Sequence, residues 1–168
     1  RQVLSFHPKQ IIILDQAETP LHHLCLETEA VVSNTKIRTV IGDIRNQGAL
    51  ENLFSLYQPQ VVFHAAAYKH VPLMEENPSQ AILTNIRGTK NLADLSCKYN
   101  VKKFVMVSTD KAVNPSNVMG ASKRIAEKYV QSLHLRSQRE NHATSTKFIT
   151  TRFGNVLGSN GSDRKSVV

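Results

Sequence analysis

The residues best suited to acid–base chemistry lie in two short runs. Thr109, Asp110 and Lys111 form the first run, and the second begins with Met119 and ends with Lys123. A hydroxyl, a carboxylate and an amine can exchange protons with a substrate, and a second amine adds positive charge. Met119 and Lys123 are four residues apart, so they share one face of a helix. The two lysines could then meet at one pocket, although a surface turn and a solvated helix lysine would have the same sequence.

Two aspartates stand where predicted strands end. Asp15 closes a strand over residues 10–15, and Asp43 precedes Ile44 just after a strand over residues 36–41. A carboxylate at the first position can bind both ribose hydroxyls of NAD and would repel the 2′-phosphate of NADP. A carboxylate at the second position can accept the adenine amino group. Each aspartate could equally do no more than cap its own turn.

Three alanines, Ala65, Ala66 and Ala67, close a further predicted strand over residues 60–65. Their small side chains let a backbone approach a ligand closely. Tight packing between a strand and a helix would use the same residues, so the run indicates a binding loop without proving one.

Short apolar runs alternate with amphipathic stretches along the chain, which predicts strands and helices in turn. The predicted strands cover residues 10–15, 36–41, 60–65, 103–108 and 147–151. The predicted helices cover residues 19–26, 46–57, 79–99 and 119–135. This alternation is typical of a Rossmann-like, doubly wound parallel sheet in the α/β class. Such a sheet binds ligands at the carboxyl ends of its strands, where the aspartates, the alanines and residues 109–111 lie.

The front of that fold is expected to be missing. Residues 1–7 resemble the end of a helix that Pro8 stops, and the first of the seven glycines is Gly42. The glycine-rich turn of a dinucleotide fold is therefore absent, and truncation is the explanation we favour. The strand that leads into this turn is the central one of such a sheet. Without it, the strands over residues 10–15 and 60–65 lose the neighbour that they share or must close the gap between them. We expect poor stability and little cofactor binding from this chain alone.

Composition limits the remaining function classes. The chain has 168 residues, 40% of them hydrophobic, and a net charge of +8. The basic residues are dispersed, so phosphorylated ligands explain their excess at least as well as nucleic acid does. No apolar run approaches the ~20 residues of a membrane helix. Cys25 and Cys97 lack CxxC spacing and the histidines lack ligand spacing, so no metal site is expected.

Four segments together resemble a known family. They are residues 61–78 (VVFHAAAYKHVPLMEENP), 84–92 (TNIRGTKNL), 107–127 and 150–162. They resemble the CapD-like polysaccharide-biosynthesis family, the UDP-N-acetylglucosamine 4,6-dehydratases of the extended short-chain dehydrogenase/reductases. The resemblance implies NAD as the cofactor, with NADP not excluded. It implies that C4 of the sugar is oxidised, water is eliminated across C5 and C6, and the hydride returns to C6.

The resemblance also implies roles for the reactive residues. Lys111 would remove the C5 proton, Asp110 would protonate the leaving oxygen and Thr109 would hydrogen-bond the C4 oxygen. Lys123 would bind the nicotinamide ribose, and burial together with its charge would lower the pKa of Lys111. Met119 stands where the superfamily carries its tyrosine base, a replacement typical of the membrane-attached branch. The residues implied to lie near the sugar are Lys69, Asn85, Arg152, Asn155 and Ser159, although Arg152 could equally be a structural cation.

The remaining expectations concern the chain as a whole. Residues 1–162 form a partial dinucleotide-binding domain, and residues 163–168 (DRKSVV) match an adapter-encoded tail and not the family. The resemblance implies a UDP-sugar as ligand, a homo-oligomer and a cytoplasmic location. The domain could belong to an inner-membrane protein whose membrane helices precede it. A nucleotide-sugar epimerase and a non-catalytic dinucleotide sensor or scaffold remain the alternatives.

Overall fold

The computed structural model describes residues 2–29, 34–139 and 146–154. Its strands are β1 (Gln10–Asp15), β2 (Lys36–Ile41), β3 (Val61–His64), β4 (Lys103–Thr109) and β5 (Lys147–Phe153). Its α-helices are α1 (Glu18–Glu29), α2 (Gln47–Tyr57), α3 (Val71–Glu76), α4 (Pro78–Ala81), α5 (Thr89–Lys98) and α6 (Val118–Arg139). The shorter elements are the 3₁₀-helices η1 (Gln2–Phe6) and η3 (Asp110–Ala112) and the π-helix η2 (Ile82–Gly88).

The strands pair in parallel, as predicted, but they form two sheets. β1 pairs with β2, and β4 lies between β3 and β5. Within the described residues no strand pairing links the two sheets, so the gap expected between residues 10–15 and 60–65 stays open. The α/β class with parallel strands is therefore confirmed, while the single continuous sheet is not present in the described residues.

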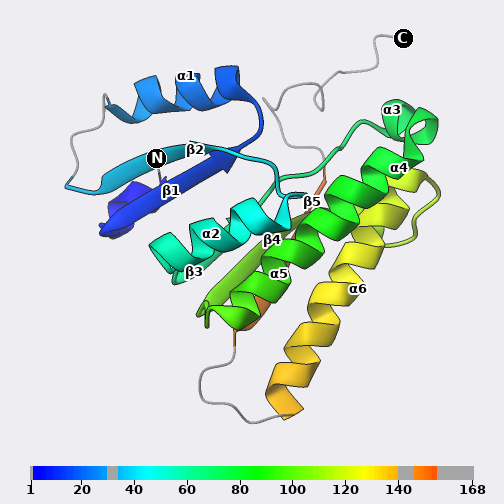
Figure 1. Ribbon diagram of the computed structural model, residues 1–168. Coiled ribbons are helices and arrows are strands. Elements are labelled where there is room, and N and C mark those ends of the chain that lie inside the picture. Colours follow the sequence, from blue (N-terminus) through cyan, green and yellow to red (C-terminus); the bar gives the residue numbers. More distant parts are fainter. Residues whose placement is uncertain (1, 30–33, 140–145, 155–168) are drawn as a thin grey trace.

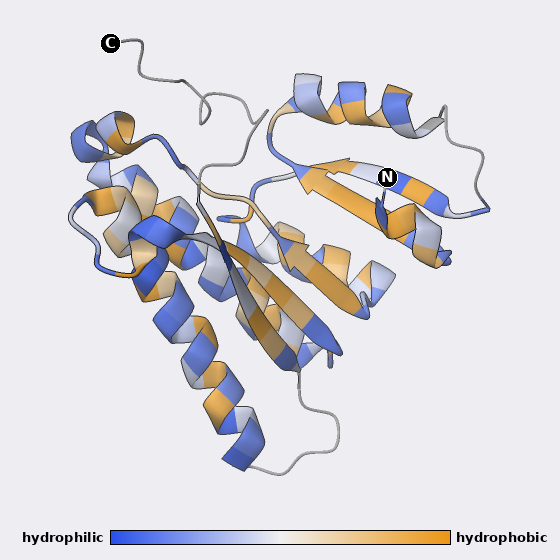
Figure 2. Cartoon of the chain, turned by 180° about the vertical axis from the view of Figure 1, so that it is seen from behind, coloured by the Kyte–Doolittle hydropathy of each residue, from blue (hydrophilic) through white to orange (hydrophobic). Residues whose placement is uncertain are grey.

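Helices α2, α5 and α6 cover one face of the three-stranded sheet (Figure 1). Phe104 of β4 is fully buried there, and its ring lies 5.4 Å from the ring of Phe148 in β5. Figure 2 shows apolar residues on the opposite face, which no described helix covers. Phe63 and Phe153 are 64% and 50% exposed. The core therefore lies on the helical side of this sheet.

The predicted helix over residues 79–99 is continuous but not uniform. α4 leads into η2, whose π-helical turns are wider than those of an α-helix, and η2 leads into α5. Gly88 faces Ile44, and a Cβ on this glycine would lie 2.4 Å from the Ile44 side chain. The wider turn and the missing side chain let this segment approach the end of β2 closely. Propensity alone does not reveal such a π segment, because it depends on tertiary contacts.

The amino-terminal prediction was only partly right. Residues 2–6 form a tight 3₁₀-helix that buries Leu4, and His7 adopts a positive φ of 49° just before Pro8. The proline does stop the helix, as expected, because it restricts the preceding residue and cannot continue the hydrogen bonding.

A buried histidine lies at the end of β3. His64 is 2% exposed, and its Nε2 lies 2.8 Å from Thr89 Oγ1. The Thr89 hydroxyl donates to Asn85 O at 2.6 Å, so it accepts the proton of Nε2, and Nδ1 carries none. Burial, and then the charge of Lys123, lower the pKa of His64 to about 3. The imidazole is therefore neutral in the folded chain.

We predict that His64 makes the fold acid-sensitive. In the unfolded chain its pKa is about 6.5, so below that pH only the unfolded state takes up the proton. Stability should fall by about 1.4 kcal/mol per pH unit as the pH drops from about 6 to 4.5. Urea unfolding followed by circular dichroism measures this slope. His64→Gln keeps an N–H for Thr89 without titrating and should flatten the slope; equal slopes in both proteins would contradict the assignment.

Candidate dinucleotide and active site

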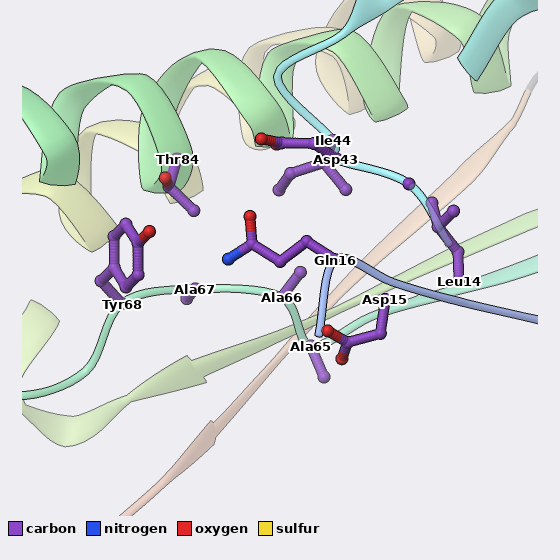
Figure 3. A pocket seen from close by; sticks show the side chains of 11 residues that line it. Leu14, Asp15, Gln16, Asp43, Ile44, Ala65, Ala66, Ala67, Tyr68 and Thr84 are labelled. Atoms are coloured by element: carbon purple, nitrogen blue, oxygen red, sulfur yellow. The ribbon is translucent and has the colours of Figure 1, made fainter. Parts of the chain in front are cut away.

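A cavity of about 210 Å³ opens where β1, β2 and β3 end (Figure 3). Parallel strands present their ligand sites at this edge. Gln16 extends its amide across the middle of the group in Figure 3. The lining residues are Leu14, Asp15, Gln16, Gly42, Asp43, Ile44, Ala65, Ala66, Ala67, Tyr68 and Thr84. All the residues predicted to bind the dinucleotide, apart from Lys123, thus lie around one cavity.

Asp15 has the capping role that its position suggested, while its binding of a ribose stays a prediction. Its Oδ1 accepts the backbone N–H of Ala17 at 2.8 Å, so it caps the turn after β1. The same side chain lines the cavity, and no described bond occupies Oδ2. Capping therefore orients the carboxylate and leaves one oxygen for a ligand.

Asp43 is held by a neighbouring arginine. Arg45 Nε donates to Asp43 Oδ2 at 2.6 Å, and the Arg45 backbone N–H donates to Oδ1 at 2.8 Å. The side-chain hydrogen bond from Arg45 holds the pKa of Asp43 below its usual value. Arg45 also donates to Gln80 Oε1 at 3.0 Å, which anchors it to α4. The sequence contained no signal for this pairing beyond the closeness of the two residues.

We call the loop after β3 that contains Ala65, Ala66 and Ala67 the alanine loop. Asn85 fixes the residue that follows it, Tyr68. The side chain of Asn85 is fully buried; its Oδ1 accepts Tyr68 N at 2.8 Å, and its Nδ2 donates to Tyr68 O at 3.0 Å. Nδ2 also donates to Ser122 Oγ at 2.9 Å. In the described structure Asn85 is a clamp between the loop and α6, and its predicted contact with the sugar stays a prediction.

The predicted proton-transfer residues lie at the end of β4 and in η3. Thr109 Oγ1 donates to Asp110 Oδ1 at 2.9 Å, and the backbone N–H of Lys111 donates to the same oxygen at 2.8 Å. The hydrogen bond from Thr109 is the main cause that lowers the pKa of Asp110. The Lys111 side chain is 40% exposed, with Nζ 3.4 Å from Asp110 Oδ1. The expectation that Lys111 is buried is therefore wrong for this chain.

The buried lysine is Lys123, which is 7% exposed. Its Nζ donates to Val107 O at 2.9 Å, and burial lowers its pKa to about 8 while Glu127 opposes the shift. Gly120 brings α6 against the reactive turn, since a Cβ there would lie 2.5 Å from Lys111 O. The helix and the turn after β4 thus pack together, while the meeting of Lys111 and Lys123 in one pocket stays a prediction.

Met119 lies in a second apolar cluster. It is 4% exposed and packs with Met74 and Ala81, and Tyr68 and Val118 pack against the cluster. A buried thioether cannot exchange a proton, so Met119 supports the site by packing.

An ion pair ties α6 to β5. Arg152 donates through Nε to Glu127 Oε1 at 2.9 Å and through a terminal nitrogen to Oε2 at 2.7 Å. Burial alone would raise the pKa of Glu127, but the hydrogen bonds and charge of Arg152 lower it overall. Arg152 therefore acts as a structural cation in this fold, which was the alternative to a contact with the sugar. The sequence signal for Glu127 was its spacing of four residues from Lys123.

The remaining predicted residues are less informative. Lys69 is exposed beside Tyr68, whereas Asn155 and Ser159 lie outside the described residues. The sequence did not single out Tyr68 and Thr84, although both line the cavity. Across the described segments no group of three His, Cys, Asp or Glu is placed to hold a metal. Among the helices that the structure describes, none combines the length and apolar character needed to cross a bilayer.

Comparison with protein families gives a match over residues 1–163 to the family described as polysaccharide biosynthesis protein. The capsular polysaccharide biosynthesis protein CapD of Staphylococcus aureus is 49% identical over 96% of this chain and 26% of its own length. The inverting UDP-N-acetylglucosamine 4,6-dehydratase of Campylobacter jejuni is 36% identical over 94% of this chain and 44% of its own. The UDP-glucose 4-epimerase of Rickettsia canadensis is 42% identical over 78% of this chain and 37% of its own. The chain thus spans less than half of each relative.

Solved structures confirm the fold. The X-ray structure of Pen from Bacillus thuringiensis superposes with a TM-score of 0.84 and 36% identity, over 96% of this chain and 47% of that one. The Thermus thermophilus UDP-glucose 4-epimerase, solved in complex with NAD, superposes with a TM-score of 0.70. It is 21% identical over 90% of this chain and 57% of its own, which supports the fold alone.

We predict that the ion pair between Glu127 and Arg152 stabilises the fold more than an exposed pair does. Arg152→Met would leave the buried Glu127 carboxylate without its main partner, whereas Lys90→Met removes an exposed partner of Asp94. Urea unfolding at neutral pH should show a larger decrease in the free energy of unfolding for Arg152→Met than for Lys90→Met. Equal decreases would contradict the prediction and mean that solvent already screens the Glu127 carboxylate.

Proposed function

The chain belongs to the polysaccharide biosynthesis protein family, and on this premise we propose that it is the dinucleotide-binding part of a nucleotide-sugar 4,6-dehydratase. The proposed substrate is a UDP-N-acetylhexosamine, which loses water across C5 and C6. The observation that carries the proposal is the turn of Thr109, Asp110 and Lys111 packed against a helix that retains Lys123 but has Met119 in place of a tyrosine.

The cavity fits the proposed cofactor. Asp15 offers an oriented carboxylate oxygen to ribose hydroxyls, and its charge favours NAD over NADP. Asp43 and Ile44 lie where adenine would bind, and the small side chains of the alanine loop leave room for the cofactor backbone. NAD, when bound, would take a hydride from the sugar and return it. Lys123 would hold the nicotinamide ribose.

The proton transfers fall to the reactive turn. Lys111 Nζ would accept the C5 proton, and Asp110 would donate a proton to the C6 oxygen, which leaves as water. On oxidation of C4 the Asp110 carboxylate would accept the proton of the C4 hydroxyl, which Asp110 later gives to the C6 oxygen, while Thr109 Oγ1 would hydrogen-bond the C4 oxygen. Lys111 would return its proton to C5 when the hydride is delivered to C6. Because the pKa of Asp110 is lowered, its carboxyl is ionised at neutral pH. The acid role therefore requires that bound substrate replace the hydrogen bond from Thr109, which is the main cause of that shift.

The other predicted residues take supporting places in this proposal. Asn85 and Arg152 hold the loop and β5 in position through the contacts described above. Lys69, Asn155 and Ser159 stay candidates for the sugar nucleotide. We also propose that the functional protein is a homo-oligomer whose catalytic part lies in the cytoplasm, either free or attached to the inner membrane.

A nucleotide-sugar epimerase is the second candidate. The observation that favours it is the 42% identity to the Rickettsia epimerase. Against it stands Met119, because epimerases of this superfamily usually keep the tyrosine. The products of the two reactions differ in mass, since an epimerase inverts a carbon centre without removing any atom.

We predict that a full-length protein containing this chain converts UDP-N-acetylglucosamine to a product lighter by one water when NAD is supplied. Lys111→Ala should slow this conversion about 10²–10⁴-fold, the usual contribution of a positioned proton acceptor. Lys128→Ala, an exposed lysine on α6, is the matched control and should retain full activity. Mass spectrometry of the sugar nucleotide reads all three.

The same experiment separates the candidates. Sugar inversion at unchanged mass would assign the protein as an epimerase. Dinucleotide binding with no turnover would favour the sensor or scaffold and overturn the dehydratase proposal.

We predict that Asp15→Asn, made in a full-length protein containing this chain, lowers NAD affinity about tenfold, because a neutral amide replaces a charged acceptor. The amide oxygen can still cap Ala17, so the turn should persist. NADP should lose much less affinity, and calorimetric titration of both cofactors measures the difference. Parallel losses for NAD and NADP would show that Asp15 does not contact the ribose.

A further inference from the structure

The edge of the three-stranded sheet opposite the cavity is strongly basic. It consists of the amino ends of β4 and β5 and the carboxyl ends of α5 and α6 (Figure 1). Every cation on it is exposed. We call these residues the basic edge: Lys98, Lys102, Lys103, Arg136, Arg139 and Lys147.

The backbone brings these cations together. Lys103 and Lys147 are directly opposite each other in the parallel register of β4 and β5. Lys147 N donates to Lys102 O at 3.0 Å, so the three lysines lie together where two adjacent strands begin. α5 and α6 pack against each other, and Lys98 and Arg136 lie in their last turns.

The lysines at the starts of the strands lack acidic neighbours in the sequence. Residues 99–103 and 146–148 contain no Asp or Glu. Lys98 pairs with Glu51 of α2, but in the part of the chain that the structure describes Lys102, Lys103 and Lys147 have no acidic partner. Like charges directly opposite each other on neighbouring strands destabilise a sheet. An anionic partner would offset that cost.

Helix dipoles explain only part of the pattern. Arg136 and Arg139 lie in the last turn of α6, and Lys98 lies in the last turn of α5, where cations are favourable. Lys102, Lys103 and Lys147 lie where strands begin and not in the last turn of a helix, so no helix dipole accounts for them. Their presence therefore calls for another explanation.

The uncharged residues at this edge indicate the kind of partner. Leu56 at the end of α2 is 73% exposed, and Leu135 near the end of α6 is 47% exposed. Tyr57 and Tyr99 are half-buried, so the described residues of this edge include no fully exposed aromatic ring on which bases could stack. Lysines mixed with exposed aliphatic side chains suit the headgroup region of an anionic bilayer.

We propose that the basic edge docks on the surface of a bilayer that contains anionic phospholipids. β4 has seven residues, so roughly 20 Å separate this edge from the carboxyl ends of the strands. Docking would therefore turn the cavity away from the lipid and leave it open to dissolved nucleotides and sugar nucleotides.

Cosedimentation of the chain with vesicles tests the proposal. We expect binding to phosphatidylglycerol-containing vesicles, weak binding to pure phosphatidylcholine vesicles, and a loss of binding as salt rises. Lys103→Gln with Lys147→Gln should weaken anionic-vesicle binding about 25-fold, or about fivefold for each lysine. Arg87→Gln with Lys128→Gln removes the same charge from exposed positions away from the edge and should change binding much less.

Two results would overturn the proposal. Equal weakening in the two double variants, with unchanged circular dichroism, would mean that net charge and not the edge attracts the lipid, which overturns the proposal. Tighter binding to single-stranded RNA than to anionic vesicles at matched salt would also overturn it and assign the edge to nucleic acid.

Discussion

Asn85 lies where the parts of the site meet. Its buried amide takes up both backbone groups of Tyr68 and reaches Ser122 on α6, so one side chain fixes the alanine loop to the helix that carries Lys123. A buried amide leaves its partners unsatisfied if it moves, which makes such a contact stiff as well as stable. The π-helical turns of η2 help to place the amide there. The loop and the active-site helix therefore cannot shift independently.

The cavity depends on a second set of contacts because its walls belong to two sheets. The segment after β2 is held to α5 by Asn91, whose Nδ2 donates to Ile44 O at 3.0 Å and Arg45 O at 3.3 Å. The close approach of Gly88 to Ile44 completes this join. The hydrogen bonds of Asn91 and the close contact at Gly88 thus hold the two walls of the cavity together, as backbone hydrogen bonds hold the strands together inside each sheet.

Much of this arrangement was predictable from the sequence, and the failures have a common cause. Strand periodicity and the order of polar residues at strand ends predicted the cavity, including Asp15 and Asp43, since parallel strands bring those ends together. The sequence could not show that Lys111 is exposed while Lys123 is buried, because burial depends on the packing of distant segments. The same holds for the pairing of Glu127 with Arg152. Local patterns predict where a side chain starts, but tertiary contacts decide what it touches.

In the proposed reaction the two lysines of the site would have different electrostatic roles. Lys123 is buried beneath the strand, and its pKa of about 8 leaves it mostly charged at neutral pH, with Glu127 supporting that charge. Lys111 lies at the surface beside Asp110, where its amine is accessible to solvent. In the proposed reaction the buried cation would bind and orient the cofactor, whereas the accessible amine would accept and release a proton. The division follows from position in the fold, because α6 packs Lys123 against β4 while the turn after β4 carries Lys111 outward.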